Sequence, residues 1–270
     1  MAMTASRSFS LSDDLALAQK LADIADAISL DRYQALDLVI ETKPDSSPVT
    51  DADKAVEKAL RDELAKARPE DIVAGEEFGV PYLTTGAHYW VIDPIDGTKN
   101  FLRGVPTWAT LIALVNPDGV VIAGVVSAPA LNRRWSAAQG LGAYLAFTSG
   151  SVLNLEQICV SKVSKLSDSS IAYSDLVGWG DRRQKFIDLQ EKVWRTRGYG
   201  DFWSHMLVAE GAVDLAVEPS LSLWDMAALD IIVREAGGKF TSITGVDGSH
   251  GKSAISSNGL IHADFIKAIG

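Results

Sequence analysis

The chain has 270 residues and a formal net charge of −10, with 25 Lys and Arg against 35 Asp and Glu residues. This length suits one large domain or two packed halves, and 47% hydrophobic with 22% charged residues is typical of a globular protein. A chain this acidic is a poor general binder of nucleic acid or of an anionic membrane, so we expect neither as a partner. An anionic substrate would need a local source of positive charge, which a bound metal ion supplies.

The single cysteine, Cys159, excludes a disulfide within this chain and favours a reducing compartment. No apolar run reaches the length of a membrane span, and residues 1–14 lack the apolar core of a signal peptide. The sequence therefore predicts a cytoplasmic protein.

Two helices are expected in the first part of the chain. Apolar residues at helical spacing predict a first helix that begins near Asp14, capped by Ser12 or Asp13. Thr50 is placed to cap a second amphipathic helix. The other elements expected in the first half are strands over residues 37–41, 72–74, 110–115 and 120–127, a loop over 43–48, and a hairpin turn over 116–119.

The second half of the chain alternates between helices and strands in a different way. We expect an N-terminal half with an antiparallel sheet over residues 1–148 and a C-terminal α/β half over residues 149–270. The elements expected in the second half are strands over residues 170–174, 213–217 and 253–256, and helices over 181–194, 203–211 and 224–236.

The most informative segment is Asp93-Pro94-Ile95-Asp96-Gly97-Thr98, which follows an apolar stretch over residues 89–92. That stretch predicts a buried strand, so two carboxylates three residues apart lie where the strand ends. Carboxylate and carbonyl oxygens are the ligands that Mg²⁺ prefers, and a glycine lets the backbone approach an anion closely. Asp, Pro and Gly are also turn formers, so the segment alone fits a plain strand-to-turn junction as well.

Further polar residues lie next to apolar elements, and each has a simple explanation when it is taken alone. Asp53 and Asp225 each lie in the first turn of a predicted helix, where the helix dipole favours an acid. Glu76, with Glu77 beside it, fits a solvated loop, and Thr98 fits the cap of a short helix.

Taken together, the acidic residues favour a metal site. They occur where apolar elements begin or end, and such ends can converge at one rim of a fold. Like charges repel strongly at short range, and divalent cations resolve that conflict. Zinc is not indicated, because the chain has no cysteine pair and no His-x-x-x-His, and it has neither a P-loop nor a dinucleotide fingerprint.

Five motifs in combination resemble the signature of the inositol monophosphatase family. They extend over most of the chain, from about residue 43 to residue 240. The motifs are Pro48-Val49-Thr50-Asp51-Ala52-Asp53, Gly75-Glu76-Glu77, Asp93-Pro94-Ile95-Asp96-Gly97-Thr98, Trp224-Asp225-Met226-Ala227-Ala228 and Glu235-Ala236-Gly237-Gly238.

The resemblance implies a five-layered α-β-α-β-α sandwich, the fold of the inositol monophosphatase and fructose-1,6-bisphosphatase superfamily. It also implies Mg²⁺-dependent hydrolysis of a phosphate monoester with two or three ions per active site, a homodimer, and inhibition by lithium. Carried over by motif, the metal ligands are Glu76, Asp93, Asp96, Asp225 and the carbonyl of Ile95, the catalytic residues are Asp53, Thr98 and Glu76, and the substrate contacts are Gly97, Thr98 and Asp225.

Two more carboxylates, Asp201 and Glu218, are expected at the non-phosphate end of the substrate. Glu218 lies shortly before Asp225, where the family places a substrate contact, and Asp201 replaces the small neutral residues of inositol phosphatases. A polyol gains little from two negative charges, whereas a cationic amine or an imidazole gains charge-assisted hydrogen bonds. A helix cap at Asp201 and a strand-end acid at Glu218 are the alternatives.

Three segments, residues 105–109, 127–130 and 194–202, resemble the actinobacterial type of histidinol-phosphate phosphatase within this family. The expected reaction is therefore hydrolysis of L-histidinol phosphate in histidine biosynthesis, with inositol-1-phosphate as the alternative substrate. Another sugar or nucleotide phosphatase and a catalytically silent metal-binding scaffold remain as further alternatives, although the intact set of acids argues against a scaffold.

Overall fold

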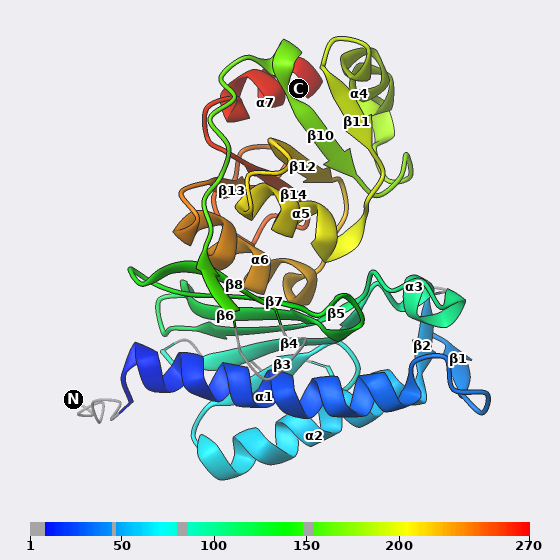
Figure 1. Ribbon diagram of the computed structural model, residues 1–270, viewed down its shortest axis with the longest axis vertical. Coiled ribbons are helices and arrows are strands. Elements are labelled where there is room, and N and C mark those ends of the chain that lie inside the picture. The colour runs from blue at the N-terminus through cyan, green and yellow to red at the C-terminus, as the bar shows by residue number, and fades with distance from the viewer. Residues whose placement is uncertain (1–8, 45–46, 80–85, 148–153) are drawn as a thin grey trace.

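The fold is a stack of five alternating helix and sheet layers (Figure 1). The structure is a computed structural model that describes residues 9–44, 47–79, 86–147 and 154–270. The expected five-layered sandwich is confirmed, with the two sheets lying between three helical layers. The helical layers are α1 (Leu11–Arg32) with α2 (Asp51–Ala67), α5 (Asp201–Ala209) with α6 (Leu223–Glu235), and α4 (Arg183–Gln190) with α7 (His262–Ile269).

Helix α1 begins three residues earlier than the sequence predicted. Its cap is Ser10, whose hydroxyl oxygen accepts the N–H of Asp13 at 3.2 Å, while Asp13 Oδ2 accepts the N–H of Ser10 at 2.9 Å. This reciprocal pair is a capping box, so Asp13 acts as the third helical residue and not as the cap. None of the helices in the described ranges combines the length and apolar character that crossing a membrane requires.

The first sheet has seven strands, and it separates the α1–α2 layer from the α5–α6 layer. The expected hairpin at residues 116–119 is confirmed, because β5 and β6 pair in antiparallel register with Ile112 opposite Val125. The sheet is not wholly antiparallel, since β3 pairs with β4 in parallel. In spatial order the strands are β3 (Ile72–Gly75), β4 (Tyr89–Asp96), β5 (Ala109–Val115), β6 (Val121–Ala128), β7 (Arg133–Ala138), β8 (Gly142–Phe147) and β9 (Asn154–Gln157).

Strand β9 extends this sheet beyond the expected boundary between the two halves. It pairs with β8 in antiparallel fashion, with Leu145 opposite Glu156. Residues 154–157 therefore pair with the N-terminal half, although the expected division after residue 148 assigns them to the C-terminal half.

The second sheet has five strands and is mixed. Strand β10 pairs in parallel with β11 and with β12, whereas β14 pairs antiparallel with β12 and with β13. Its outer face packs on α4 and α7 through an apolar cluster that includes Ile171, Phe186 and Phe265. In spatial order the strands are β11 (Arg195–Arg197), β10 (Ser170–Tyr173), β12 (Leu215–Glu218), β14 (Ala254–Ser257) and β13 (Lys239–Thr241).

Short elements differ most from the sequence-based expectations. The strand expected over residues 37–41 is β1 (Ile40–Thr42), and the loop expected over 43–48 ends early because Pro48 opens β2 (Pro48–Thr50). Residues 45–46 of that loop lie outside the described residues. The helix expected over 181–194 is limited to α4, after a 3₁₀ turn. The remaining short elements are α3 (Thr98–Arg103) and the 3₁₀ turns Pro129–Leu131, Leu166–Asp168 and Gly180–Arg182.

Helix α6 packs closely against the first sheet at Gly124 of β6. A Cβ atom built on Gly124 would lie 2.6 Å from Ile231 Cγ2 and 3.2 Å from the Cα atom of Ala228. The glycine therefore sets how near the middle layer comes to the sheet, and α6 carries Asp225 in its first turn.

Gly124→Ala should lower the free energy of unfolding by about 2 kcal/mol, because the added methyl group forces backbone and packed side chains apart. Thermal unfolding followed by circular dichroism measures the change. Gly198→Ala is the control, since its added methyl group would meet no atom closer than 3.6 Å. Equal melting temperatures for Gly124→Ala and wild type would contradict this account of the interface.

Candidate active site

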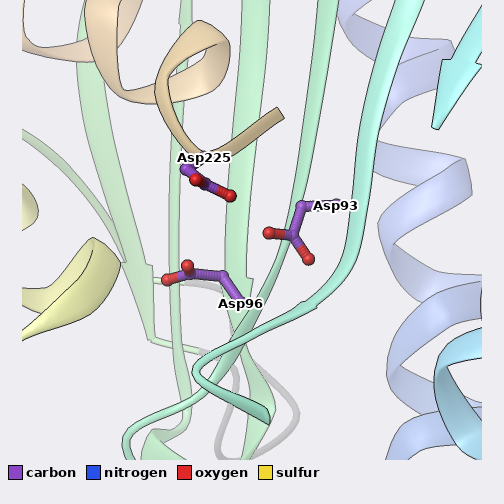
Figure 2. Close-up of side chains that lie close together, drawn as sticks. All are labelled: Asp93, Asp96 and Asp225. Carbon is purple, nitrogen blue, oxygen red and sulfur yellow. The ribbon is translucent and has the colours of Figure 1, made fainter. Parts of the chain in front are cut away.

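Three aspartates form the centre of the site (Figure 2). Asp93, Asp96 and Asp225 each offer a carboxylate oxygen, and these oxygens lie within 4.8 Å of one another. Asp93 and Asp96 belong to β4, which continues past Ile92 where the sequence suggested an end, and Asp225 lies in the first turn of α6. Elements from two different layers thus meet at one point.

A bulge in β4 makes this cluster possible. Residues three apart on a regular strand point to opposite faces. The pairing of β4 with β5 shifts between Asp93, opposite Leu111, and Asp96, opposite Ala109, so one extra residue lies on β4. The extra residue turns both aspartates toward Asp225.

Capping boxes at two helix N-termini hold Asp225 and Asp53. The N–H of Ser222 donates to Asp225 Oδ2 at 2.7 Å, and the N–H of Thr50 donates to Asp53 Oδ2 at 2.8 Å. The predicted cap at Thr50 is therefore confirmed. Each cap uses only Oδ2 of its aspartate. Asp53 and Asp225 can therefore cap a helix and also offer their other oxygen, Oδ1, to the site.

Buried oxygens without partners show that the cluster suits a cation. Asp53 Oδ1 and Asp93 Oδ1 are both buried and have no hydrogen-bond partner. A buried unpaired carboxylate oxygen is costly, and a hard cation ligated by oxygen atoms removes that cost. The donor set is carboxylate oxygen only, which fits Mg²⁺ better than a thiolate-binding or imidazole-binding metal.

Burial and mutual repulsion raise the pKa values of these acids. Burial is the larger cause, and it lifts the pKa of Asp93 and of Asp96 well above the ordinary range, with neighbouring negative charges adding to the shift. Burial likewise raises the pKa of Asp53 and of Asp225 to about 6, although the capping hydrogen bonds oppose the shift. The acids are thus arranged for a cation and are destabilised without one.

Glu76 follows β3 and lies beside the aspartates. Its negative charge raises the pKa of Asp93 and of Asp53, but among the described residues it falls outside the cluster of three carboxylates. Lys43 Nζ donates to Glu76 Oε1 at 2.6 Å and to Glu77 Oε1 at 2.7 Å. The side chain of Glu77 is only 5% exposed, so a solvated acidic loop is wrong for this residue.

The turn after β4 is a tight glycine turn at the start of a short helix. Gly97 has a φ of +82° and precedes α3, and a Cβ atom there would lie 2.9 Å from the carbonyl oxygen of Thr107. Only glycine fits that position. Thr98 is the first residue of α3 and not its cap, and its hydroxyl donates to the carbonyl oxygen of Ile95 at 3.0 Å.

Asp201 and Glu218 form a second acidic group, which a serine hydroxyl links. Ser174 Oγ donates to Glu218 Oε1 at 2.5 Å and accepts the N–H of Asp201 at 3.1 Å. Asn100 Nδ2 donates to Asp201 Oδ2 at 3.0 Å and so ties Asp201 to α3. Asp201 opens α5 with a φ of +48°, and Gly200 is the cap, so the alternative of an Asp201 cap is wrong.

Burial also raises the pKa values in this second group. It lifts the pKa of Glu218 to about 8, against the hydrogen bond from Ser174 and with the negative charges of Asp201 and Asp225 adding to the shift. The pKa of Asp201 is raised as well by burial, although Lys99 opposes that shift. Neither carboxylate forms an ion pair with a lysine or arginine within the described ranges.

Both acidic groups line one cavity of about 600 Å³. Asp53 and Asp93 are buried, with 0% and 2% exposure, and do not line the cavity, and the carbonyl oxygen of Ile95 accepts the hydroxyl of Thr98. The structure thus brings the sequence-predicted site residues together around this cavity. Those that line it directly are Glu76, Asp96, Gly97, Thr98, Asp201, Glu218 and Asp225.

Sequence reasoning missed several residues that shape the site. Glu57 is fully buried, pairs with Arg61 at 2.8 Å, and accepts the N–H groups of Glu77 at 2.7 Å and Phe78 at 3.2 Å. It thereby fixes the loop that carries Glu76. Glu57 lies four residues after Asp53 on the same face of a helix, and this spacing could have identified it from the sequence. Lys43, Asn100 and Ser174 could not be identified in this way, because their partners lie far away in the sequence.

Comparison with known proteins identifies the family of this chain. The model of the inositol monophosphatase family matches residues 10–269. The histidinol-phosphatases of Streptomyces coelicolor and of Mycobacterium tuberculosis are each 56% identical to this chain, covering 94% of it and 96% of their own length. The fructose-1,6-bisphosphatase/inositol-1-monophosphatase of Thermotoga maritima is 38% identical over 82% of each chain.

Solved structures share the same fold. An IMPase from Thermotoga maritima superposes with a TM-score of 0.83 at 32% identity, covering 95% of this chain and 96% of its own. The extragenic suppressor protein suhB from Bartonella henselae gives a TM-score of 0.84 at 29% identity, with 95% and 98% covered. The chain therefore belongs to the inositol monophosphatase family.

The raised pKa values predict how the metal-free protein responds to pH. Asp53 and Asp225 with values near 6, and Glu218 near 8, keep protons in the folded state that the unfolded chain releases from about pH 4 upward. The folded state binds more protons, so stability should fall as pH rises from 5 to 8.

In EDTA we expect a melting temperature lower by roughly 5 °C or more at pH 8 than at pH 5. Excess Mg²⁺ should reduce this difference, because a bound cation compensates the ionised carboxylates. Differential scanning calorimetry checks both statements. A metal-free protein that becomes more stable toward pH 8 would show that the acids are not destabilising.

Proposed function

We propose that this protein is a Mg²⁺-dependent phosphatase that hydrolyses L-histidinol phosphate to L-histidinol and phosphate, a step of histidine biosynthesis. The observation that carries the proposal is one cavity bordered by two neighbouring groups of acids, a metal end with Asp96 and Asp225 of the three-aspartate cluster and a second end with Asp201 and Glu218. The first end suits a metal-bound phosphate, and the second suits a cationic group. The names of the two relatives at 56% identity support the same substrate.

The metal end would hold two or three Mg²⁺ ions. When bound, the ions would supply positive charge that acidifies a water molecule and stabilises the phosphate and the leaving oxygen. Within the chain, Lys43 already supplies one positive charge at Glu76. The residues that would hold the ions are Glu76, Asp93, Asp96, Asp225 and the carbonyl of Ile95.

Thr98 and Asp53 would orient the attacking water and take its proton. The hydroxyl of Thr98 already donates its one proton to Ile95 O, so toward a water molecule it can only accept. Asp53 has a free oxygen, Oδ1, and a pKa of about 6, raised by burial, which suits a general base near neutral pH. No side chain needs to form a covalent phospho-enzyme in this scheme.

The phosphate would lie at the turn formed by Gly97 and Thr98. Backbone N–H groups that follow a glycine at the start of a helix point toward an anion, and the close contact of Gly97 with Thr107 keeps that turn tight. Asp225 borders the same cavity and would contact both metal and substrate.

The alternative substrate is inositol-1-phosphate. It is favoured by relatives such as the inositol-1-monophosphatase of Rhizobium meliloti, which is 34% identical over 81% of each chain. Against it stand the two buried carboxylates at the far end, which a neutral polyol does not need. A phosphate-release screen over histidinol phosphate, inositol phosphate, fructose bisphosphate and adenosine bisphosphate separates these substrates, and no release with any of them would favour a silent scaffold.

Replacement of one metal ligand should abolish catalysis and leave the fold intact. Asp93→Asn or Asp225→Asn should reduce kcat/KM more than about a hundredfold at saturating Mg²⁺, because each loses a ligand charge at constant volume. Phosphate release measures the loss, and circular dichroism checks the fold. Asp118→Asn, at an exposed turn, is the matched control. Activity near wild type in the Asp93 variant would overturn the metal site.

Asp201→Asn should lower kcat/KM for histidinol phosphate by about tenfold, because a charge-assisted contact becomes a neutral one. The same change should alter inositol-1-phosphate hydrolysis little or improve it. Steady-state kinetics on both substrates gives the comparison. A wild-type preference for inositol phosphate would refute the substrate, whereas equal losses on both substrates would refute the role of Asp201.

Three further properties are proposed from family resemblance and composition. We expect a homodimer, which light scattering at working concentration tests by mass. Lithium inhibition is expected in the same phosphate-release assay. A cytoplasmic location is expected, and fractionation of the source cells tests it.

A further inference from the structure

His205 is a buried histidine that the proposed chemistry leaves without a role. It lies on α5, is 1% exposed, and borders the cavity near its second acidic end. Its Nδ1 atom is 2.6 Å from Ser256 Oγ of β14. Its Nε2 atom is buried without a hydrogen-bond partner and lies 3.9 Å from Glu218 Oε1. Buried polar atoms are rarely unpaired, so this atom calls for an explanation.

The imidazole is neutral, and that property determines what it can do. Burial lowers the pKa of His205 to about 3, so only one ring nitrogen carries a proton near neutral pH. If the hydroxyl of Ser256 donates to Nδ1, the proton lies on Nε2 and faces Glu218. A neutral N–H donor orients the carboxyl group of Glu218 and adds no positive charge that would compete with a cationic substrate group.

Glu218 is held from one side only in the metal-free and substrate-free protein. Ser174 Oγ donates to its Oε1 atom, and no lysine or arginine pairs with it in the part of the chain that the structure describes. The gap of 3.9 Å to His205 Nε2 exceeds a normal N–H···O bond by about 1 Å. A small movement of the carboxylate therefore completes a second hydrogen bond.

We propose that His205 is a positioning residue for substrate recognition, whose Nε2–H holds the carboxylate of Glu218 in place to bind the ammonium group of the substrate. The proposal rests on the proposed function, since it concerns the same site and a cationic substrate. Ser256, His205, Glu218 and the ammonium group then form one chain of hydrogen bonds from β14 to the cavity.

Two polar replacements of His205 separate this role from a structural one. In His205→Gln the amide N–H₂ reaches the position of Nε2, whereas in His205→Asn it reaches only the position of Nδ1 near Ser256. The measured quantity is the ratio of kcat/KM for histidinol phosphate to kcat/KM for 2-glycerophosphate, an ester without a cation. The full chain is assayed with Mg²⁺.

We expect His205→Asn to lower this ratio about tenfold through a higher KM for histidinol phosphate, and His205→Gln to keep it within about threefold of wild type. Both variants should hydrolyse 2-glycerophosphate at near the wild-type rate. Equal losses on both esters, or a better ratio in His205→Asn than in His205→Gln, would overturn the role of His205. A wild type without preference for histidinol phosphate would instead refute the proposed substrate.

A measurement on the wild-type protein covers the case in which a variant does not fold. The ¹⁵N chemical shifts of the His205 ring, from NMR of labelled protein, should show a proton on Nε2, and the Nε2–H signal should shift when L-histidinol is added. Addition of glycerol should leave it in place. A proton on Nδ1, or the same response to both compounds, would overturn the proposal.

Discussion

The repulsion between buried carboxylates is the constraint on which the site depends. Asp93 and Asp96 come from one bulged strand, and Asp53 and Asp225 come from two helix N-termini. The positive ends of two helix dipoles and two capping boxes partly offset the negative charge. They cannot remove it, because burial still raises the pKa of each acid. The fold holds these acids together only because packing elsewhere is strong enough to do so.

The middle helical layer supplies that packing and joins the two ends of the site. Helix α6 contacts the first sheet through Gly124 and carries Asp225, while α5 carries Asp201 and His205. Asp201 binds Asn100 of α3, which follows the first sheet, and His205 binds Ser256 of β14 in the second sheet. The cavity is therefore lined by residues from both sheets, from α3 and from the middle helical layer.

The sequence predicted what is encoded locally. The cap at Thr50, the hairpin at residues 116–119 and the six-residue motif from Asp93 each depend on neighbours within a few positions. The parallel pairing of β3, the bulge between Asp93 and Asp96 and the bond from Asn100 to Asp201 depend on chain segments far apart, which no local pattern reveals. The start of α1 was wrong for a local reason, because Ser10 and Ser12 are both able to cap a helix.

The two ends of the cavity differ in the partners that their acids have. At the metal end Glu76 forms an ion pair with the ammonium group of Lys43. A metal ion that binds Glu76 therefore shares this carboxylate with Lys43. At the other end Ser174 donates to Glu218 and Asn100 donates to Asp201, and both of these donors are neutral. Neutral donors fix the direction of these carboxyl groups and bring no positive charge of their own, so a cation carried by the substrate can pair with the acids in their ionised form. A polyol cannot compensate the desolvation of the two carboxylates at this end. The selectivity of the cavity therefore depends on which residues bind the acids, a lysine at the metal end and neutral donors at the other, more than on the acids themselves.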